Sequence, residues 1–299
     1  MLILAVVLAL GAALSNAVNL MTQHLASVAS PPGVTGVRLA RYLIRQPMWL
    51  LGAGAGVSSY ILQAGALNNG PLSVVQPLLI TELIFVMVLR RVWIHQHVRP
   101  AAWASVLTVA GALAVFLAAA EPTGGQPAPN AAEWLTAGVV FGGIIAGLTL
   151  LGLHGPPLRR AAVLAAAAAM TWAMEAVFLK TATETLTASG PVAMLTGWPV
   201  YAFAAATAVG TVLQQAALHV GPLSVSQPLL AIVDPLAAIV LSVWLFDERF
   251  SGSPADTAIA VVAFGVMAAG VVALTRTAPE DLSPDSKDSP DNPDSQEPG

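Results

Sequence analysis

Three acidic residues, Glu82, Glu175 and Asp234, lie inside apolar stretches that are long enough to cross a membrane. An ionisable side chain in a membrane costs several kcal/mol unless it is paired, hydrated or neutralised, so each is a candidate for function. Burial disfavours the charged form of a carboxylic acid, and such a group can take and release protons. Glu82 and Asp234 are therefore candidates for proton coupling. The alternative for both is a structural acid bonded to a neighbouring helix, and Glu175 has the further alternative of pairing with Lys180 or a backbone group.

Amide side chains accompany these acids. Gln76 and Gln227 each precede a proline, and Gln63 and Gln214 form a second pair at the same separation of 151 residues. Amides in a membrane also act as hydrogen bonds between helices, which stays open as the alternative for each. In the first apolar stretch, Asn16, Asn19 and Gln23 are spaced i, i+3 and i+7, which is one helical face. The predicted substrate- or proton-binding residues are Glu82, Asp234, Gln76, Gln227, Gln63, Gln214, Glu175 and Asn19.

An internal repeat determines how these residues are placed. The segment 70–79, GPLSVVQPLL, returns at 221–230 as GPLSVSQPLL, with nine of ten positions identical. The stretch 14–19 also aligns with 170–175. Pro77 and Pro228 remove backbone donors in mid-helix and free carbonyl groups, which makes a polar patch in an otherwise apolar segment. Duplicated halves with interrupted helices are typical of secondary transporters.

The composition indicates a polytopic membrane protein. Hydrophobic residues make up 56% of the chain and charged residues only 9%, against about 25% charged in a soluble domain. A helix needs about 20 apolar residues to cross the hydrocarbon. Nine segments satisfy this, and the stretches 30–46 and 181–196 are too polar to cross. The nine predicted spans are 2–24, 47–67, 71–91, 100–120, 131–153, 161–180, 197–218, 222–246 and 255–275.

Basic residues predict the orientation, because cytoplasmic loops are rich in arginine and lysine. With nine spans, one side carries eight arginines, whereas the opposite loops carry only Lys180 and Arg249. The N-terminus is then outside and the C-terminus cytoplasmic. Four spans, one unpaired span and four further spans make the two repeats inverted. The eight arginines are Arg38, Arg41, Arg45, Arg90, Arg91, Arg99, Arg159 and Arg160.

We therefore expect an all-α polytopic membrane protein of about nine helices in two inverted repeats, arranged 4+1+4. The first repeat is 1–120, a linking helix is 131–153, and the second repeat is 161–276. The remaining segment, 277–299, holds seven acids, one lysine and five prolines, a composition that cannot form a core and predicts disorder.

Other classes of chemistry lack their residues. The chain has no cysteine, no histidine pair with metal-ligand spacing and no nucleophile motif, so we expect neither an enzyme nor a cofactor or metal site. The predicted partners are a small-molecule substrate and the lipid bilayer, without nucleic acid. A homodimer is an open alternative.

The second repeat resembles a known family. Its pattern from Ala217 to Pro235, with the later motif Leu245-Phe-Asp-Glu-Arg249, is similar to the drug/metabolite transporter superfamily, and in particular to its EamA-type and NIPA-like members. The resemblance covers about residues 1–276 and is looser in the first repeat, where Gln96-His97 replaces the acidic pair. Fuller members have ten spans, so a count of nine is closer to the NIPA-like branch. That branch implies magnesium transport, but Val57 stands near the place where its members carry a glutamate.

The resemblance and the buried acids together predict a plasma-membrane secondary transporter. It would move a small metabolite or drug-like solute by alternating access, with protons bound at Glu82 and Asp234. One alternative is a NIPA-like transporter of magnesium or other divalent cations, with the carboxylates as hard oxygen ligands. The other is a membrane scaffold that transports nothing.

Overall fold

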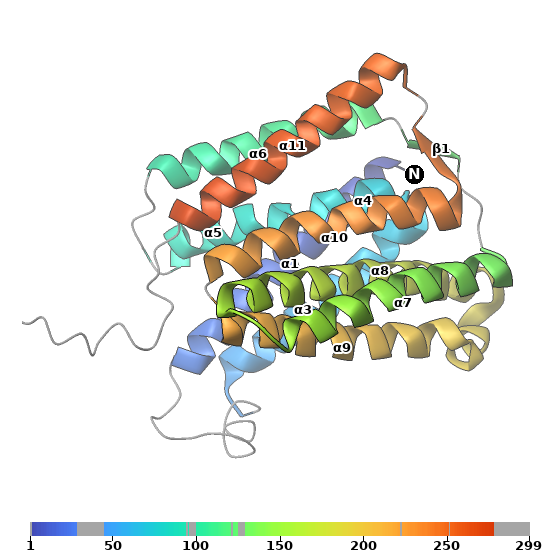
Figure 1. Ribbon diagram of the computed structural model, residues 1–299, viewed down its shortest axis with the longest axis horizontal. Helices are drawn as coiled ribbons and strands as arrows, with labels where there is room; N and C mark the ends of the chain where they lie inside the picture. Colours follow the sequence, from blue (N-terminus) through green and yellow to red (C-terminus); the bar gives the residue numbers. More distant parts are fainter. Residues whose placement is uncertain are drawn as a thin grey trace, which may run out of the picture.

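The computed structural model describes residues 2–28, 45–93, 95, 100–120, 122–124, 129–221, 223–250 and 252–277. Within these ranges the protein is all-α and polytopic, as predicted, and nine helical segments are long and apolar enough to cross a membrane (Figure 1). The third span is divided into two helices, α4 and α5. The helices are α1 (Leu2–Val28), α3 (Pro47–Asn69), α4 (Leu72–Leu79), α5 (Thr81–Trp93), α6 (Pro100–Ala120), α7 (Ala131–Gly152), α8 (Pro157–Thr196), α9 (Trp198–Val220), α10 (Leu223–Phe246) and α11 (Pro254–Thr277).

The packing repeats as the sequence does. Helix α1 packs along α3 in the first half, and α8 packs along α9 in the second. Both α1 and α8 bury a face of alanines, and the two sets are related by an offset of 156 residues, the one that aligns 14–19 with 170–175. Close helix approach through small residues replaces the hydrophobic effect inside a membrane. The buried alanines are Ala5, Ala9, Ala12, Ala13 and Ala17 in α1, and Ala161, Ala165, Ala168, Ala169 and Ala173 in α8.

The glycines that end the second helix of each half show the same equivalence. A Cβ at Gly70 would lie 2.6 Å from Cβ of Ala5, and a Cβ at Gly221 would lie 2.5 Å from Cβ of Ala161. No side chain larger than hydrogen fits at either place without movement of the alanine-lined helix. The repeated Gly-Pro-Leu-Ser turn is therefore a packing contact as well as a turn.

The last helices of the two halves run in opposite directions. Helix α6 is followed by strand β1 (Pro122–Gly124), and α11 is preceded by strand β2 (Glu248–Phe250). The two strands pair antiparallel, with Thr123 opposite Arg249. The end of α6 and the beginning of α11 therefore meet at one end of the molecule, and Figure 1 shows the two helices side by side. This is the inversion that the sequence predicts, although the small ribbon of β1 and β2 is not predicted.

As predicted, 181–196 forms no span of its own, although α8 continues as far as Thr196. Four threonine hydroxyls each donate to the carbonyl one turn earlier, which satisfies their polar groups within the helix. The helix is interrupted only at Gly190, which has a positive φ of 85° and precedes Pro191. The part of α8 before this kink, from Pro157 to Ser189, is about 50 Å long, and the whole of α8 counts as one span, so the count of nine is unchanged. The four hydroxyls belong to Thr181, Thr183, Thr185 and Thr187.

Charge is distributed unequally between the two ends of the bundle. Arg45 precedes α3, Arg90 and Arg91 end α5, and Arg159 and Arg160 begin α8, so these five lie at one end, named here the arginine-rich end. Arg249 lies at the other end, in β2. Arg38, Arg41 and Arg99 lie outside the described residues, as does the acidic segment beyond Thr277. Which end faces the cytoplasm stays a prediction.

Candidate functional site

The structure places the three membrane acids on three different helices. Glu82 is in the first turn of α5, Asp234 is at the middle of α10 beside Pro235, and Glu175 is buried in α8 at 3% exposure. Asp234 interacts electrostatically with Glu82 and with Glu175. Asp234 is therefore the central member of a series that we name the acid row, consisting of Glu82, Asp234 and Glu175.

The break in the third span positions Glu82. Pro77 lies inside α4 and has no backbone donor, and the helix ends at Leu79. The hydroxyl of Thr81 donates to the Leu78 carbonyl at 2.6 Å, and the new helix begins there. The N-terminus of a helix carries a partial positive charge, so a carboxylate in the first turn of α5 is favoured. The mate of Pro77, Pro228, leaves α10 continuous, so the break occurs in only one of the two repeats.

Amide side chains of α1 form a series of hydrogen bonds that ends at Glu82. Asn16 Nδ2 donates to Glu82 Oε2 at 2.7 Å, and Asn19 Nδ2 donates to Asn16 Oδ1 at 3.2 Å. Gln23 in turn donates to Asn19 Oδ1, and its side chain is exposed. The three amides lie on one face, as their spacing predicts. They form a continuous polar series between the half-buried Glu82 and the end of α1.

Glu175 is bonded by hydroxyl groups. Thr207 Oγ1 donates to Glu175 Oε1 at 3.2 Å, and the Tyr60 hydroxyl lies within hydrogen-bonding reach of the same carboxylate. The alternative that Glu175 pairs with Lys180 is wrong. Residues five apart on a helix are about 140° apart around its axis, and Lys180 pairs instead with Glu184 and Glu248.

Equivalent positions in the two repeats carry different chemistry. Asn19 aligns with Glu175 at the offset of 156, and Gly56 aligns with Thr207 at the offset of 151. A Cβ at Gly56 would lie 3.2 Å from Nδ2 of Asn19, just as Thr207 contacts Glu175. The same pair of helices thus presents an amide in one half and an acid in the other.

Asp234 is the least satisfied of the three acids. Its Oδ1 atom is shielded from solvent and makes no hydrogen bond. A buried polar atom of this kind costs free energy unless a proton or a ligand supplies the missing donor.

The glutamine pairs are not bonded to the acid row in the described ranges. Gln76 is buried at 3% exposure in α4, and Gln63 at 8% in α3. Their mates Gln227 and Gln214 are half-buried in α10 and α9. Helices α4 and α10 pack against each other, which brings together the elements that carry Gln76 and Gln227. A role for the two pairs in binding stays a prediction.

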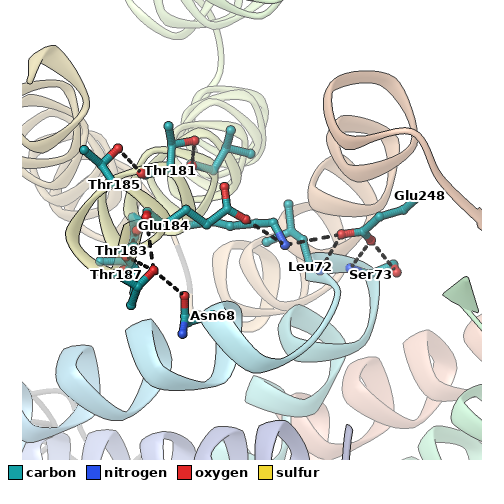
Figure 2. A network of polar contacts seen from close by, with 12 residues as sticks. Asn68, Leu72, Ser73, Thr181, Thr183, Glu184, Thr185, Thr187 and Glu248 are labelled. Carbon is teal, nitrogen blue, oxygen red and sulfur yellow. Dashed lines mark hydrogen bonds and ion pairs between the residues drawn. The ribbon is translucent and has the colours of Figure 1, made fainter. Parts of the chain in front are cut away.

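A second polar cluster was not found from the sequence. Glu248 is buried at 3% exposure and caps the N-terminus of α4. Leu72 N donates to its Oε1 at 2.9 Å. Ser73 donates to Oε2 twice, from its backbone N at 3.1 Å and its hydroxyl at 2.7 Å. Figure 2 shows the carboxylate facing both residues.

Lys180 links this cap to α8. Its Nζ lies 3.7 Å from Glu248 Oε1 and 3.7 Å from Glu184 Oε1, and it lies over the Phe246 ring at 4.9 Å from the centroid. We name Glu248, Lys180 and Glu184 the clamp. The sequence motif at 245–249 marks Glu248 as unusual, but its partners are 68 and about 175 positions away along the chain, so no local spacing could identify them.

The acid row is not arranged for a metal ion. Across the described ranges, no three histidine, cysteine, aspartate or glutamate side chains are grouped closely enough to hold one. What the acid row offers chemically is a set of negative or protonated oxygens, with hydroxyl and amide donors beside them.

Comparison with known proteins yields one relative. The chain is 28% identical over 279 residues to an uncharacterized protein of Corynebacterium glutamicum, and the alignment covers 92% of this chain and 96% of that protein. The two are thus similar along nearly their whole length. No family model matches the chain, and no solved structure matches it. Since the relative is uncharacterized, function has to be argued from the site itself.

Proposed function

We propose that this multi-pass membrane protein is a secondary transporter of the drug/metabolite transporter type, which moves a small organic solute by alternating access. The observation that carries the proposal is the acid row, in which acids from both repeats interact inside the bundle. Glu82 belongs to the first half, and Asp234 and Glu175 belong to the second. In transporters built from inverted repeats, substrate and coupling ions bind near the midplane where the halves meet.

The interrupted third span supports the same proposal. At Ile80 the backbone stays right-handed (φ −58°, ψ −25°), but the amides of Ile80 and Leu83 bond to carbonyls three residues earlier, so the α-helical hydrogen-bond pattern is broken locally. Here the break between Leu79 and Thr81 comes immediately before Glu82. A helix that begins in mid-membrane at an acid is the kind of feature from which transporters build ion and solute sites.

An organic solute fits the acid row better than a divalent metal ion. Magnesium needs near-ideal octahedral geometry from several closely spaced oxygens, and the described acids are not grouped in that way. Val57 adds no carboxylate to the second span. Proton coupling through Glu82 and Asp234 is part of the proposal, since carboxylic acids in this setting can exchange protons with water from either side.

Accessibility labelling tests alternating access without knowledge of the solute. The chain has no native cysteine, so a single Val233→Cys, next to Asp234, reports on this site alone. We expect a membrane-impermeant methanethiosulfonate reagent to modify it in both intact cells and inverted vesicles. The matched control is Val139→Cys on the exposed face of α7, which should react from neither side. Failure of Val233→Cys to react from one or both sides would contradict the proposal, and a scaffold predicts no reaction at all.

A further inference from the structure

The charge balance of the acid row points to the kind of solute. Its hydrogen-bond donors are Asn16 on Glu82 and Thr207 on Glu175, both of them neutral. Wherever the structure describes the chain, no lysine, arginine or histidine forms an ion pair with these acids. The buried Lys180 is already held by Glu184 and Glu248. Ionised acids in a membrane need compensating positive charge, and no basic side chain of the described residues provides it to these acids as an ion pair.

The unsatisfied oxygen of Asp234 is the second observation. Its Oδ1 is buried and makes no hydrogen bond, whereas Glu82 and Glu175 each accept one from the protein. The group that this oxygen lacks is a donor. An ammonium group carries three hydrogen-bond donors and a positive charge. It would therefore supply both the donor that Asp234 lacks and the positive charge that the acids lack.

The number of acids favours an organic dication over a singly charged cation. Asp234 is within electrostatic range of both Glu82 and Glu175, so a solute with two positive charges compensates more of the row than a solute with one. The aromatic rings of Tyr60 and Phe203 meet edge to face at 5.5 Å between centroids, with the Tyr60 hydroxyl beside Glu175. Aromatic faces also attract ammonium groups, through cation–π interaction.

We propose that the acid row binds a short aliphatic ammonium cation and prefers a diamine, whose two charges compensate two of the three acids. The inference rests on the proposed function, because it takes the acid row as the transport site. It goes further by assigning the solute a positive charge. An anion or a neutral solute would bring no positive charge to the acids, which would then depend on bound protons alone.

A series of four-carbon compounds isolates the effect of charge. Butane-1,4-diamine, 4-aminobutan-1-ol, butane-1,4-diol and succinate have similar length and differ in their end groups. We expect calorimetric titration of the full chain in lipid nanodiscs to give the tightest binding for the diamine. The amino alcohol should bind about 10- to 100-fold more weakly, the factor that follows from losing one hydrogen bond between charged groups. The diol and succinate should show no saturable binding.

Substitutions locate the binding. Asp234→Asn and Glu175→Gln keep shape but remove charge, and each should weaken diamine binding by about tenfold or more. Asp247→Asn is the matched control, since it removes an exposed carboxylate (57% exposed) paired only with Arg249 among the described residues; it should bind as the unaltered protein does. The ligand series needs no variant, so it decides the question even where a substitution prevents folding.

Several outcomes would overturn the inference. Equal binding of the diol or succinate and the diamine would do so, as would no binding of either amine, or displacement of the diamine by magnesium ions at equal concentration. Uptake of the labelled compounds into proteoliposomes separates this inference from the function. Uptake of succinate without amine binding would retain a transporter and reject a cationic solute. Diamine binding without uptake would retain the site and reject transport.

Discussion

Replacing Glu248 by glutamine tests the clamp that holds the N-terminus of α4. The substitution keeps the length of the side chain and removes its charge and one acceptor oxygen. Glu248 now accepts three hydrogen bonds and lies 3.7 Å from Lys180 Nζ. A glutamine has a single acceptor oxygen, so at least one donor of Leu72 or Ser73 would face an NH2 group, and Lys180 would keep only Glu184.

The burial of Lys180 and Glu248 determines how much stability the substitution should remove. The side chains of Lys180 and Glu248 are 10% and 3% exposed, so solvent screens the pair only weakly. Breaking a buried pair by removing one partner costs about 3–5 kcal/mol, which we expect for Glu248→Gln. Lys180→Met should cost less than half as much, because Glu248 retains its three donors at the N-terminus of α4. The double variant should lose less free energy of unfolding than the sum of the two single variants, by an interaction energy on the order of 1 kcal/mol.

The assay is reversible unfolding in mixed micelles of sodium dodecyl sulfate and dodecyl maltoside, followed by intrinsic tryptophan fluorescence. Asp247→Asn is the control, because Asp247 is adjacent in the chain but pairs with Arg249 on the surface, where an ion pair contributes at most about 1 kcal/mol. Asparagine also tolerates the positive φ of 49° at this position. Equal free energies of unfolding for Glu248→Gln and Asp247→Asn would refute the reasoning, and additivity in the double variant would show that the pair does not interact.

Three further predictions concern orientation, the acids and the C-terminal segment. A single Ala131→Cys should label with impermeant maleimide from outside, and His154→Cys only from inside, because the arginine-rich end is predicted to be cytoplasmic; the reverse pattern would overturn the orientation. Glu82→Gln and Asp234→Asn should both insert and purify normally, and at least one should lose uptake driven by a proton gradient in proteoliposomes; full gradient-driven uptake in both would make these acids structural. A chain that ends at Arg276 should elute as one monodisperse peak on size exclusion, since the removed composition cannot form a core; aggregation of this chain alone would contradict that.

The sequence predicts the helices and their repeat well, because membrane spans follow from local composition and the repeat from direct comparison of two segments. The faces of α1 are predictable in the same way, since Asn16 and Asn19 need only helical spacing to be placed together. The end of α8 is less predictable, because threonine reads as polar although its hydroxyl is satisfied within its own helix. The capping of α4 by Glu248 is beyond such reasoning. It depends on the tertiary packing of β2, α4 and α8, which no periodicity in the sequence specifies.

The clamp also makes the two repeats unequal in a way that bears on the transport cycle. If two inverted halves were identical, exchanging their conformations would open the binding site to the other side of the membrane with no change in free energy. The position equivalent to Glu248 at the repeat offset of 151 is His97, which has no carboxylate, so the exchanged state cannot form the same ionic cap. In a transporter of this design, the clamp therefore sets the resting preference between the two states, by a factor of about ten for every 1.4 kcal/mol of its strength. Under the proposed function, substitutions in the clamp should change how long the protein faces each side of the membrane while leaving unchanged which solute it accepts.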